Sequence, residues 1–160
     1  MQSNIEIKNL TIQDLDFLNQ TEKLFFDLHE YLKPKKLQLP LIENGEKIWV
    51  QSIKNTLGKY STVVVAIKES KVVGFGCGIL KFLPEYLGSN KIGSITHFFI
   101  CDEYRDMNIG KGINEKLYEW FSLQNITSIE VQVAAINPEA EIFWKKNGFA
   151  HELIQLRKFM

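Results

Sequence analysis

The segment from Tyr104 to Gly112 carries the residue types and spacing that best suit a chemical role. It follows an apolar stretch and precedes a run with helical periodicity, and Gly110 and Gly112 lie at that junction. A helix N-terminus leaves about four backbone N–H groups unpaired and carries a partial positive charge. Small residues there let a phosphate approach those amides, and Asn108 tolerates the left-handed backbone that such a loop often needs. The segment is therefore a candidate phosphate-binding loop, although an ordinary strand-to-helix turn explains the glycines alone equally well.

Two common phosphate loops do not fit this segment. A Walker A motif requires Gly-Lys followed by Ser or Thr, whereas Lys111 is followed by Gly112. The dinucleotide fingerprint requires a third glycine where this chain has Glu115. These mismatches disfavour a nucleotide-binding α/β protein, which we keep as an alternative.

Two motifs in the second half of the chain resemble those of the GNAT N-acetyltransferase superfamily. Residues 105–110, RDMNIG, resemble its acetyl-CoA-binding pattern Arg/Gln-x-x-Gly-x-Gly/Ala, with Asn108 at the position of the first glycine. Residues 137–149, NPEAEIFWKKNGF, resemble the pattern Asn-x-x-Ala-x-x-Phe/Leu-Tyr-x-x-x-Gly-Phe. One predicted strand separates the two motifs, as in the family. Over about residues 60–150 the amino-acid sequence itself resembles the family. The first 58 residues resemble it only in the order of their predicted elements.

The resemblance implies transfer of an acetyl group from acetyl-CoA directly to a primary amine of a small molecule or peptide. It also implies that the fourth and fifth strands splay apart and hold the pantetheine arm of CoA between them. The fourth-strand backbone, the loop amides and the second motif would bind the cofactor, and no metal is expected. The cofactor-binding residues implied in this way are Phe98, Phe99, Ile100, Arg105, Asp106, Met107, Asn108, Ile109, Gly110, Lys111, Gly112, Asn137 and Phe143.

The general acid and base are less well defined by the sequence. Trp144 stands where many family members have a tyrosine acid, and Gln132 stands where relatives that acetylate protein N-termini often have a glutamate. His97 is the best candidate base, because it lies in the fourth strand and histidine titrates near neutrality. Three options remain for the leaving thiolate: protonation by Tyr118, protonation by water, or departure without an acid. A structural histidine and a packing tyrosine are the alternatives, and they leave open a non-catalytic acyl-CoA-binding or regulatory module.

The elements that must position these residues follow from periodicity. We predict the order β-α-α-β-β-β-α-β-α-β, an α/β fold with a mixed sheet that has an antiparallel meander and a later parallel crossover, as in the GNAT fold. The predicted strands span 4–10, 61–67, 72–80, 94–100, 126–134 and 149–159, and the predicted helical regions span 11–34, 40–58, 109–123 and 137–148. Acceptor selectivity is expected from residues 20–60 and from the loop at 81–93.

Local signals mark several of these boundaries. Thr11 followed by Asp14 is typical of a capping-box helix start. Asn137 before Pro138 predicts a capped N-terminus, and Gly148 predicts the end of the same helix. Alternate glycines at positions 74, 76 and 78 strip one strand face of side chains, which favours close packing over an opening for the acceptor.

Composition limits the remaining classes of protein. With 160 residues, 45% of them hydrophobic, the chain suits one domain over residues 1–160. A net charge of +0 disfavours nucleic-acid or polybasic membrane binding, and no apolar run approaches the length of a membrane span. The first residues lack the pattern of a secretory signal and only two cysteines are present, so we expect a cytoplasmic protein. A homodimer would be usual for the family.

Overall fold

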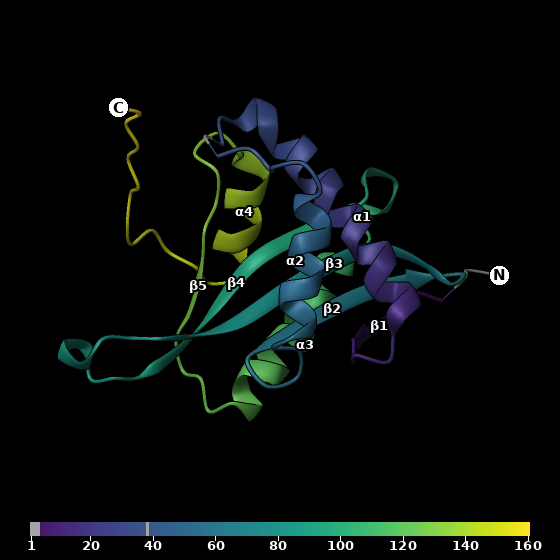
Figure 1. Ribbon diagram of the computed structural model, residues 1–160, viewed down its shortest axis with the longest axis horizontal. Coiled ribbons are helices and arrows are strands. Elements are labelled where there is room, and N and C mark those ends of the chain that lie inside the picture. The colour runs from purple at the N-terminus through teal and green to yellow at the C-terminus, as the bar shows by residue number, and fades with distance from the viewer. Residues whose placement is uncertain (1–3, 38) are drawn as a thin grey trace.

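Five strands form one sheet in the order β1-β2-β3-β4-β5, in a computed structural model that describes residues 4–37 and 39–160 (Figure 1). The strands are β1 (Glu6–Asn9), β2 (Ser61–Lys68), β3 (Lys71–Phe82), β4 (Lys91–Ile100) and β5 (Ile129–Val131). The α-helices are α1 (Leu15–Leu32), α2 (Gly45–Lys54), α3 (Ile109–Leu123) and α4 (Pro138–Lys146). Short 3-10 turns η1 (Lys33–Lys35), η2 (Glu85–Leu87) and η3 (Asp102–Tyr104) lie between them. The predicted mixed α/β architecture is confirmed.

The first four strands form an antiparallel meander, and β5 joins β4 in parallel, as predicted. The hairpin between β2 and β3 turns at Glu69 and Ser70, which both have positive φ angles of 50° and 64°. Two successive left-handed residues produce the tight turn whose twist matches that of the flanking strands.

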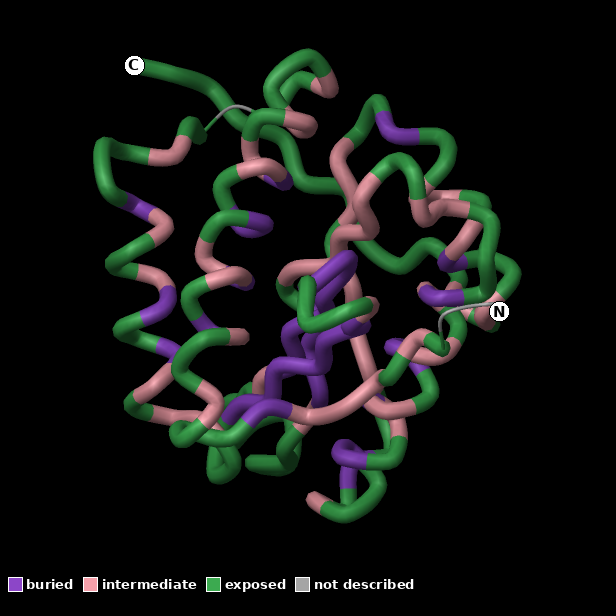
Figure 2. Tube along the Cα trace, turned by 90° about the vertical axis from the view of Figure 1, so that its right-hand side faces the viewer, coloured by how far each residue is buried: buried purple, intermediate pink, exposed green. Residues whose placement is uncertain are grey.

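Helices cover both faces of the sheet, and the central strands between them are buried (Figure 2). The core on the face of α1 and α2 includes Phe25 and Phe75, and the core on the face of α3 includes Leu117 and Phe121. A Cβ atom at Gly78 would lie 2.8 Å from the Phe121 ring, so this strand glycine gives α3 room to pack. The packing interpretation of the glycine stripe is therefore supported.

The parallel ladder between β4 and β5 stops early, and this opens the sheet. Only Gly93–Ile95 pair with Ile129–Val131, after which the two segments diverge. A bulge adds Thr96 to β4, because Cys77 pairs with His97 while Gly78 pairs with Ile95. A bulge shifts the alternation of side chains by one residue. As a result Ile95 and Phe98 both belong to the core beneath α3, whereas His97 packs against Phe25 of α1.

Several predicted boundaries change in the structure. The predicted strand at 149–159 is wrong: residues 150–160 are exposed and have no secondary structure. The sheet ends at β5, which has only three residues and offers this segment little edge with which to pair. The predicted strand at 126–134 shortens to β5, because the chain leaves β4 after Val131.

Two predicted caps also differ. Thr11 N donates to Asp14 Oδ2 at 2.8 Å, but this contact closes a turn ahead of α1, which begins at Leu15. Asn137 occupies the N-cap position of α4 without a capping side-chain hydrogen bond. Gly148 does end α4 in a left-handed conformation with φ 88°, as predicted.

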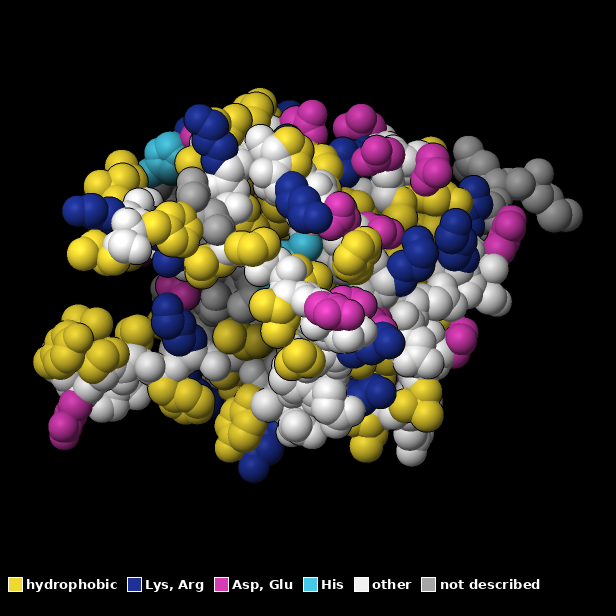
Figure 3. Space-filling view, turned by 45° about the horizontal axis from the view of Figure 1, so that its top comes forward, with side chains coloured by type: hydrophobic (Ala, Val, Ile, Leu, Met, Phe, Trp, Pro, Cys, Tyr) yellow, Lys and Arg dark blue, Asp and Glu magenta, His cyan; other side chains and the backbone are white. Residues whose placement is uncertain are grey.

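The segment at 81–93, predicted as a loop, extends β3 and β4 into a hairpin that projects from the sheet (Figure 1). Apolar side chains cover its tip, and Tyr86 is 85% exposed there (Figure 3). Over residues 4–37 and 39–160, no helix has the length and apolarity needed to cross a membrane.

Candidate active site

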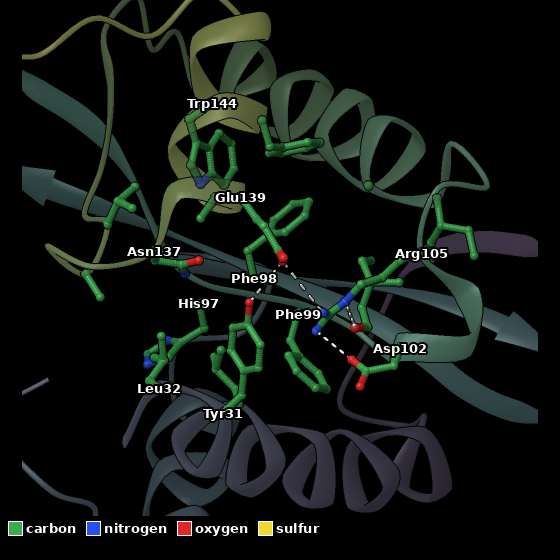
Figure 4. Close-up of a pocket in the computed structure, with 18 of the residues that line it drawn as sticks. Tyr31, Leu32, His97, Phe98, Phe99, Asp102, Arg105, Asn137, Glu139 and Trp144 are labelled. Carbon is green, nitrogen blue, oxygen red and sulfur yellow. Dashed lines mark hydrogen bonds and ion pairs between the residues drawn. The ribbon is translucent and has the colours of Figure 1, made fainter. Parts of the chain in front are cut away.

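A cleft of about 990 Å³ occupies the gap where β4 and the segment after β5 diverge. Its walls come from the end of α1, from β4, from the loop before α3 and from the start of α4 (Figure 4). The predicted site residues that line it are His97, Phe98, Phe99, Ile100, Arg105, Asp106, Asn108, Ile109, Gly110, Lys111, Asn137 and Phe143. The fold thus brings both sequence motifs to one cavity.

The loop before α3 forms one end of the cleft. Asp106 and Asn108 are both left-handed, with φ angles of 60° and 59°, and α3 begins directly afterwards at Ile109. Asn108 therefore adopts the left-handed conformation that asparagine was expected to tolerate at this position. The first helical hydrogen bond runs from Gly112 N to Asn108 O at 3.2 Å, so the N–H groups of residues 109–111 precede the helical ladder. Together with the helix dipole, these amides suit an anionic group such as a pyrophosphate.

Arg105 ties this loop to β4 and to both walls of the cleft. Its Nε donates to the Ile100 carbonyl at 3.1 Å, and its Nη2 lies 2.9 Å from Asp102 Oδ1. Its Nη1 lies 3.9 Å from Glu139 Oε2 on α4. The guanidinium carbon lies 4.9 Å from the ring centroid of Tyr31 on α1, within the range of a cation–π contact. Arg105 therefore helps to set the width of the cleft (Figure 4).

Asn137 places an unused hydrogen-bond acceptor in the cleft wall. The residue is 8% exposed, and its buried Oδ1 finds no partner in the described part of the chain. A buried polar group without a partner costs free energy, roughly 1–3 kcal/mol. The orphaned carbonyl fits a ligand that donates an N–H group, as the amides of a pantetheine arm do.

His97 lies on the α1 side of the cleft, enclosed by aromatic rings. Its ring centroid is 4.7 Å from that of Phe25 and 5.5 Å from that of Trp49. Burial, and next the charge of nearby His29, lower the pKa of His97 to about 3. Burial also lowers the pKa of His29. Both imidazoles are therefore neutral at pH 7.

Thr96 Oγ1 and His97 Nδ1 form a hydrogen bond of 2.9 Å, and its direction depends on the tautomer of the imidazole. In the tautomer with the proton on Nδ1, the Thr96 hydroxyl accepts and Nε2 is a hydrogen-bond acceptor. The contact of 3.5 Å between Thr96 Oγ1 and the Cys77 carbonyl is compatible with that tautomer.

Three predicted site residues do not line the cleft. Met107 is 55% exposed, and Gly112 lies against Ile7 of β1, where an added Cβ atom would clash. Tyr118 accepts a hydrogen bond from Asn114 Nδ2 at 2.8 Å within α3, and burial raises its pKa. The close packing explains Gly112 without a ligand, and the structure gives the predicted acid role of Tyr118 no geometric support.

The structure adds residues to which sequence reasoning assigned no role. Glu139 and Asp102 hold Arg105, and Thr96 orients His97. The one available signal was proximity: Glu139 lies two positions after Asn137 in the second motif, and Asp102 lies three before Arg105. Gln132 and Trp144 also line the cleft.

Neither cysteine is activated as a nucleophile. Burial raises the pKa of Cys77 to about 11. Burial, and then the charges of Glu103 and Asp27, raise the pKa of the Cys101 thiol. Since the thiolate is the reactive form of cysteine, an acyl-cysteine intermediate has no support in this site.

The sequence profile of the acetyltransferase (GNAT) family matches residues 20–149. No curated protein matches the chain. Among solved structures, an aminoglycoside acetyltransferase from an uncultured soil metagenomic sample, in complex with sisomicin, has a TM-score of 0.72 at 16% identity, covering 98% of this chain and 96% of that one.

Two further structures share the fold over nearly their whole length. The aminoglycoside N-acetyltransferase AAC(6')-Iy in complex with CoA has a TM-score of 0.75 at 13% identity, covering 99% of this chain and 97% of its own. Glucosamine-6-phosphate N-acetyltransferase from Arabidopsis thaliana has a TM-score of 0.69 at 18% identity, with 98% of both chains covered.

Proposed function

Because the chain belongs to the GNAT acetyltransferase family, we propose that it is an N-acetyltransferase that moves the acetyl group of acetyl-CoA directly to a primary amine. The acceptor is a small molecule or a peptide. We retain a cytoplasmic location, a single domain and a homodimer as predictions.

The observation that carries this proposal is the cleft between β4 and β5. It has loop amides and a helix N-terminus at one end, and the unpartnered Oδ1 of Asn137 in its wall. This donor and acceptor set fits an elongated ligand with an anionic end and amide groups along its arm. The amides of residues 109–111 and Lys111 would hold the pyrophosphate, and Asn137 would accept from the arm.

The bound cofactor supplies an acetyl group in an activated thioester. The edge of β4 after Ile95 has no strand partner in the described chain, so its backbone N–H groups on that side are available to polarise an acyl oxygen. His97 Nε2 can accept an N–H bond from the acceptor amine and so orient it. Alignment of the two reactants in one cleft accounts for much of the expected acceleration.

The amine must lose a proton, and the structure makes His97 a weak base. With a pKa of about 3, caused by burial and by His29, the imidazole cannot take a proton efficiently from an alkylammonium, whose usual pKa in water is about 10.4. We therefore propose that the neutral amine is the form that attacks. Its proton reaches the leaving sulfur through water, and His97 acts by orientation.

One set of observations favours a second candidate, the non-catalytic acyl-CoA-binding module. Tyr118 lies outside the cleft, and the indole of Trp144 can donate a hydrogen bond but not a useful proton. Such a module would bind acetyl-CoA and release no free thiol with any amine.

The test is thermal stability with acetyl-CoA, with ATP and NAD as controls, followed by release of free CoA thiol in the presence of primary amines. Ligand at about 100 times its dissociation constant stabilises by about 2.7 kcal/mol, or about 8 °C for a domain of this size. Stabilisation by acetyl-CoA together with thiol release supports the enzyme. Stabilisation without release across amines of every charge supports the binding module, and no stabilisation contradicts both.

A further inference from the structure

The cleft has a second half, on the side of α1, that is lined mainly by apolar side chains. We call it the α1 side. Its wall includes Leu28 and Leu32 of α1 and Leu37 after η1. Leu37 is 43% exposed, so this apolar wall reaches the surface. The part of the chain that follows carries two more exposed apolar residues, Leu39 and Ile42.

Within residues 4–37 and 39–160, α1 contributes no carboxylate to the lining of the cleft. The acidic residues that line the whole cleft are Asp102, Asp106 and Glu139. Arg105 pairs with Asp102 and Glu139, and Asp106 belongs to the loop before α3. Glu139 reaches this wall from α4, where its Oε2 accepts from the Tyr31 hydroxyl at 3.3 Å, and it is shared with Arg105. The α1 wall itself therefore offers no carboxylate that would compensate several positive charges on a ligand.

The acidic residues in the second half of α1 pair with lysines of their own helix or of the turn that follows it. Asp27 pairs with Lys23 at 3.5 Å, and Glu30 pairs with Lys33. Neither carboxylate lines the cleft.

Lysine side chains also border the cleft. Lys35 Nζ lies 4.7 Å from the ring centroid of Tyr31, and Lys146 lines the cleft. Like charges repel within a Debye length, about 8 Å at physiological salt. A polycationic acceptor would meet positive charge at this side, whereas a body without charge would not.

Two neutral imidazoles complete this part of the wall. With its proton on Nδ1, His97 presents Nε2 as an acceptor, and the buried Nε2 of His29 has no hydrogen-bond partner in the described chain. Their ring centroids are 6.2 Å apart. His97 and Leu32 both line the cleft, so an imidazole and an apolar side chain face the same cavity (Figure 4).

We propose that the acceptor is a hydrophobic monoamine: a primary amine whose single amino group is carried on an aromatic or aliphatic body. The body contacts the leucines of the α1 side, and the amine donates an N–H bond to His97 Nε2. This inference rests on the proposed N-acetyltransferase function and narrows its substrate class.

The first experiment compares kcat/KM for 2-phenylethylamine with that for two polycations, spermidine and sisomicin, at saturating acetyl-CoA. Burial of a phenyl-sized group corresponds to roughly a 10- to 100-fold gain, and we expect 2-phenylethylamine to be preferred by at least that factor. Equal or faster acetylation of either polycation would overturn the inference and leave the proposed function intact.

Leu32 supplies a matched pair of variants. It is partly exposed at the last position of α1, which makes a polar side chain tolerable there. Leu32→Glu should lower kcat/KM for 2-phenylethylamine about tenfold and raise it for spermidine. Leu32→Gln introduces a side chain of similar size without a charge. It should lower kcat/KM for 2-phenylethylamine without raising kcat/KM for spermidine. Both variants must still be stabilised by acetyl-CoA, which shows that they fold.

If neither class of amine is turned over, the decisive measurement is the further rise in Tm when each amine is added to the CoA-bound protein. A larger rise with 2-phenylethylamine supports the inference. A larger rise with spermidine, or no rise with either amine, overturns it. A protein that acetyl-CoA itself does not stabilise contradicts the proposed function instead.

Discussion

Tyr31 and Glu139 join the two walls of the cleft, since the Tyr31 hydroxyl donates to Glu139 Oε2 at 3.3 Å across 108 positions of sequence. Tyr31 lies at the end of α1 and Glu139 in the first turn of α4, with Arg105 beside them (Figure 4). Any ligand that fills the cleft between these walls competes with this contact. The bond is exposed, so it stabilises the fold only modestly.

The first prediction follows from that competition. Tyr31→Phe should tighten acetyl-CoA binding roughly 2- to 10-fold, because an ordinary hydrogen bond contributes about 0.5–1.5 kcal/mol. Calorimetric titration measures the change. Tyr86→Phe, at the exposed tip of the projecting hairpin, is the control and should leave affinity unchanged. Weaker binding by Tyr31→Phe would show that the hydroxyl contacts the cofactor instead of obstructing it.

The second prediction concerns Arg105, which is one of two arginines among 19 basic residues. Arg105→Gln removes the bond to the Ile100 carbonyl and leaves Asp102 and Glu139 uncompensated beside the cleft. We expect acetyl-CoA affinity to fall at least tenfold, since uncompensated carboxylates repel an anionic cofactor. The other arginine provides the control: Arg157→Gln, in the exposed C-terminal segment, should change affinity less than twofold.

Local patterns were sufficient to predict much of the fold. The predicted helix at 109–123 has the same bounds as α3, because its apolar residues repeat on one face and Asn108 defines its start. The strand predicted at 149–159 is absent from the structure. A strand needs a partner edge, and β5 offers only three residues, which a local sequence pattern does not reveal.

The candidate site was only partly predictable. The loop at 105–111 follows from motif spacing within one short segment. The contact between Tyr31 and Glu139 could not be foreseen, because only the tertiary fold brings α1 to α4. The low pKa of His97 likewise depends on burial among residues of other elements and on His29 of α1.

The third prediction uses the left-handed backbone at Asn108, with φ 59°. Glycine adopts this conformation without strain, whereas a β-branched residue pays roughly 1–2 kcal/mol. Asn108→Gly should therefore keep or improve acetyl-CoA affinity, and Asn108→Val should weaken it about tenfold. Fluorescence titration with a labelled CoA would measure both. Equal affinities for the two variants would mean that the loop conformation does not control binding.

The fourth prediction concerns stability against pH. Burial and the charge of His29 lower the pKa of folded His97 to about 3, whereas the pKa of a histidine in an unfolded chain is 6.5. Below pH 6.5 the unfolded chain takes up a proton that the folded chain refuses, so the stabilising contribution is full above pH 6.5 and declines as pH falls toward 3. His29, whose pKa burial also lowers, acts in the same direction.

We expect the free energy of unfolding, measured in urea, to fall from pH 6.5 to 4.5 by at most about 1.4 kcal/mol per pH unit for each of these histidines. His97→Gln should flatten this slope whatever it does to stability at pH 7, because the slope counts only the proton taken up on unfolding. Equal slopes for wild type and His97→Gln would show that His97 is not held neutral by its aromatic surroundings, and the orienting role proposed for it would then give way to that of a base.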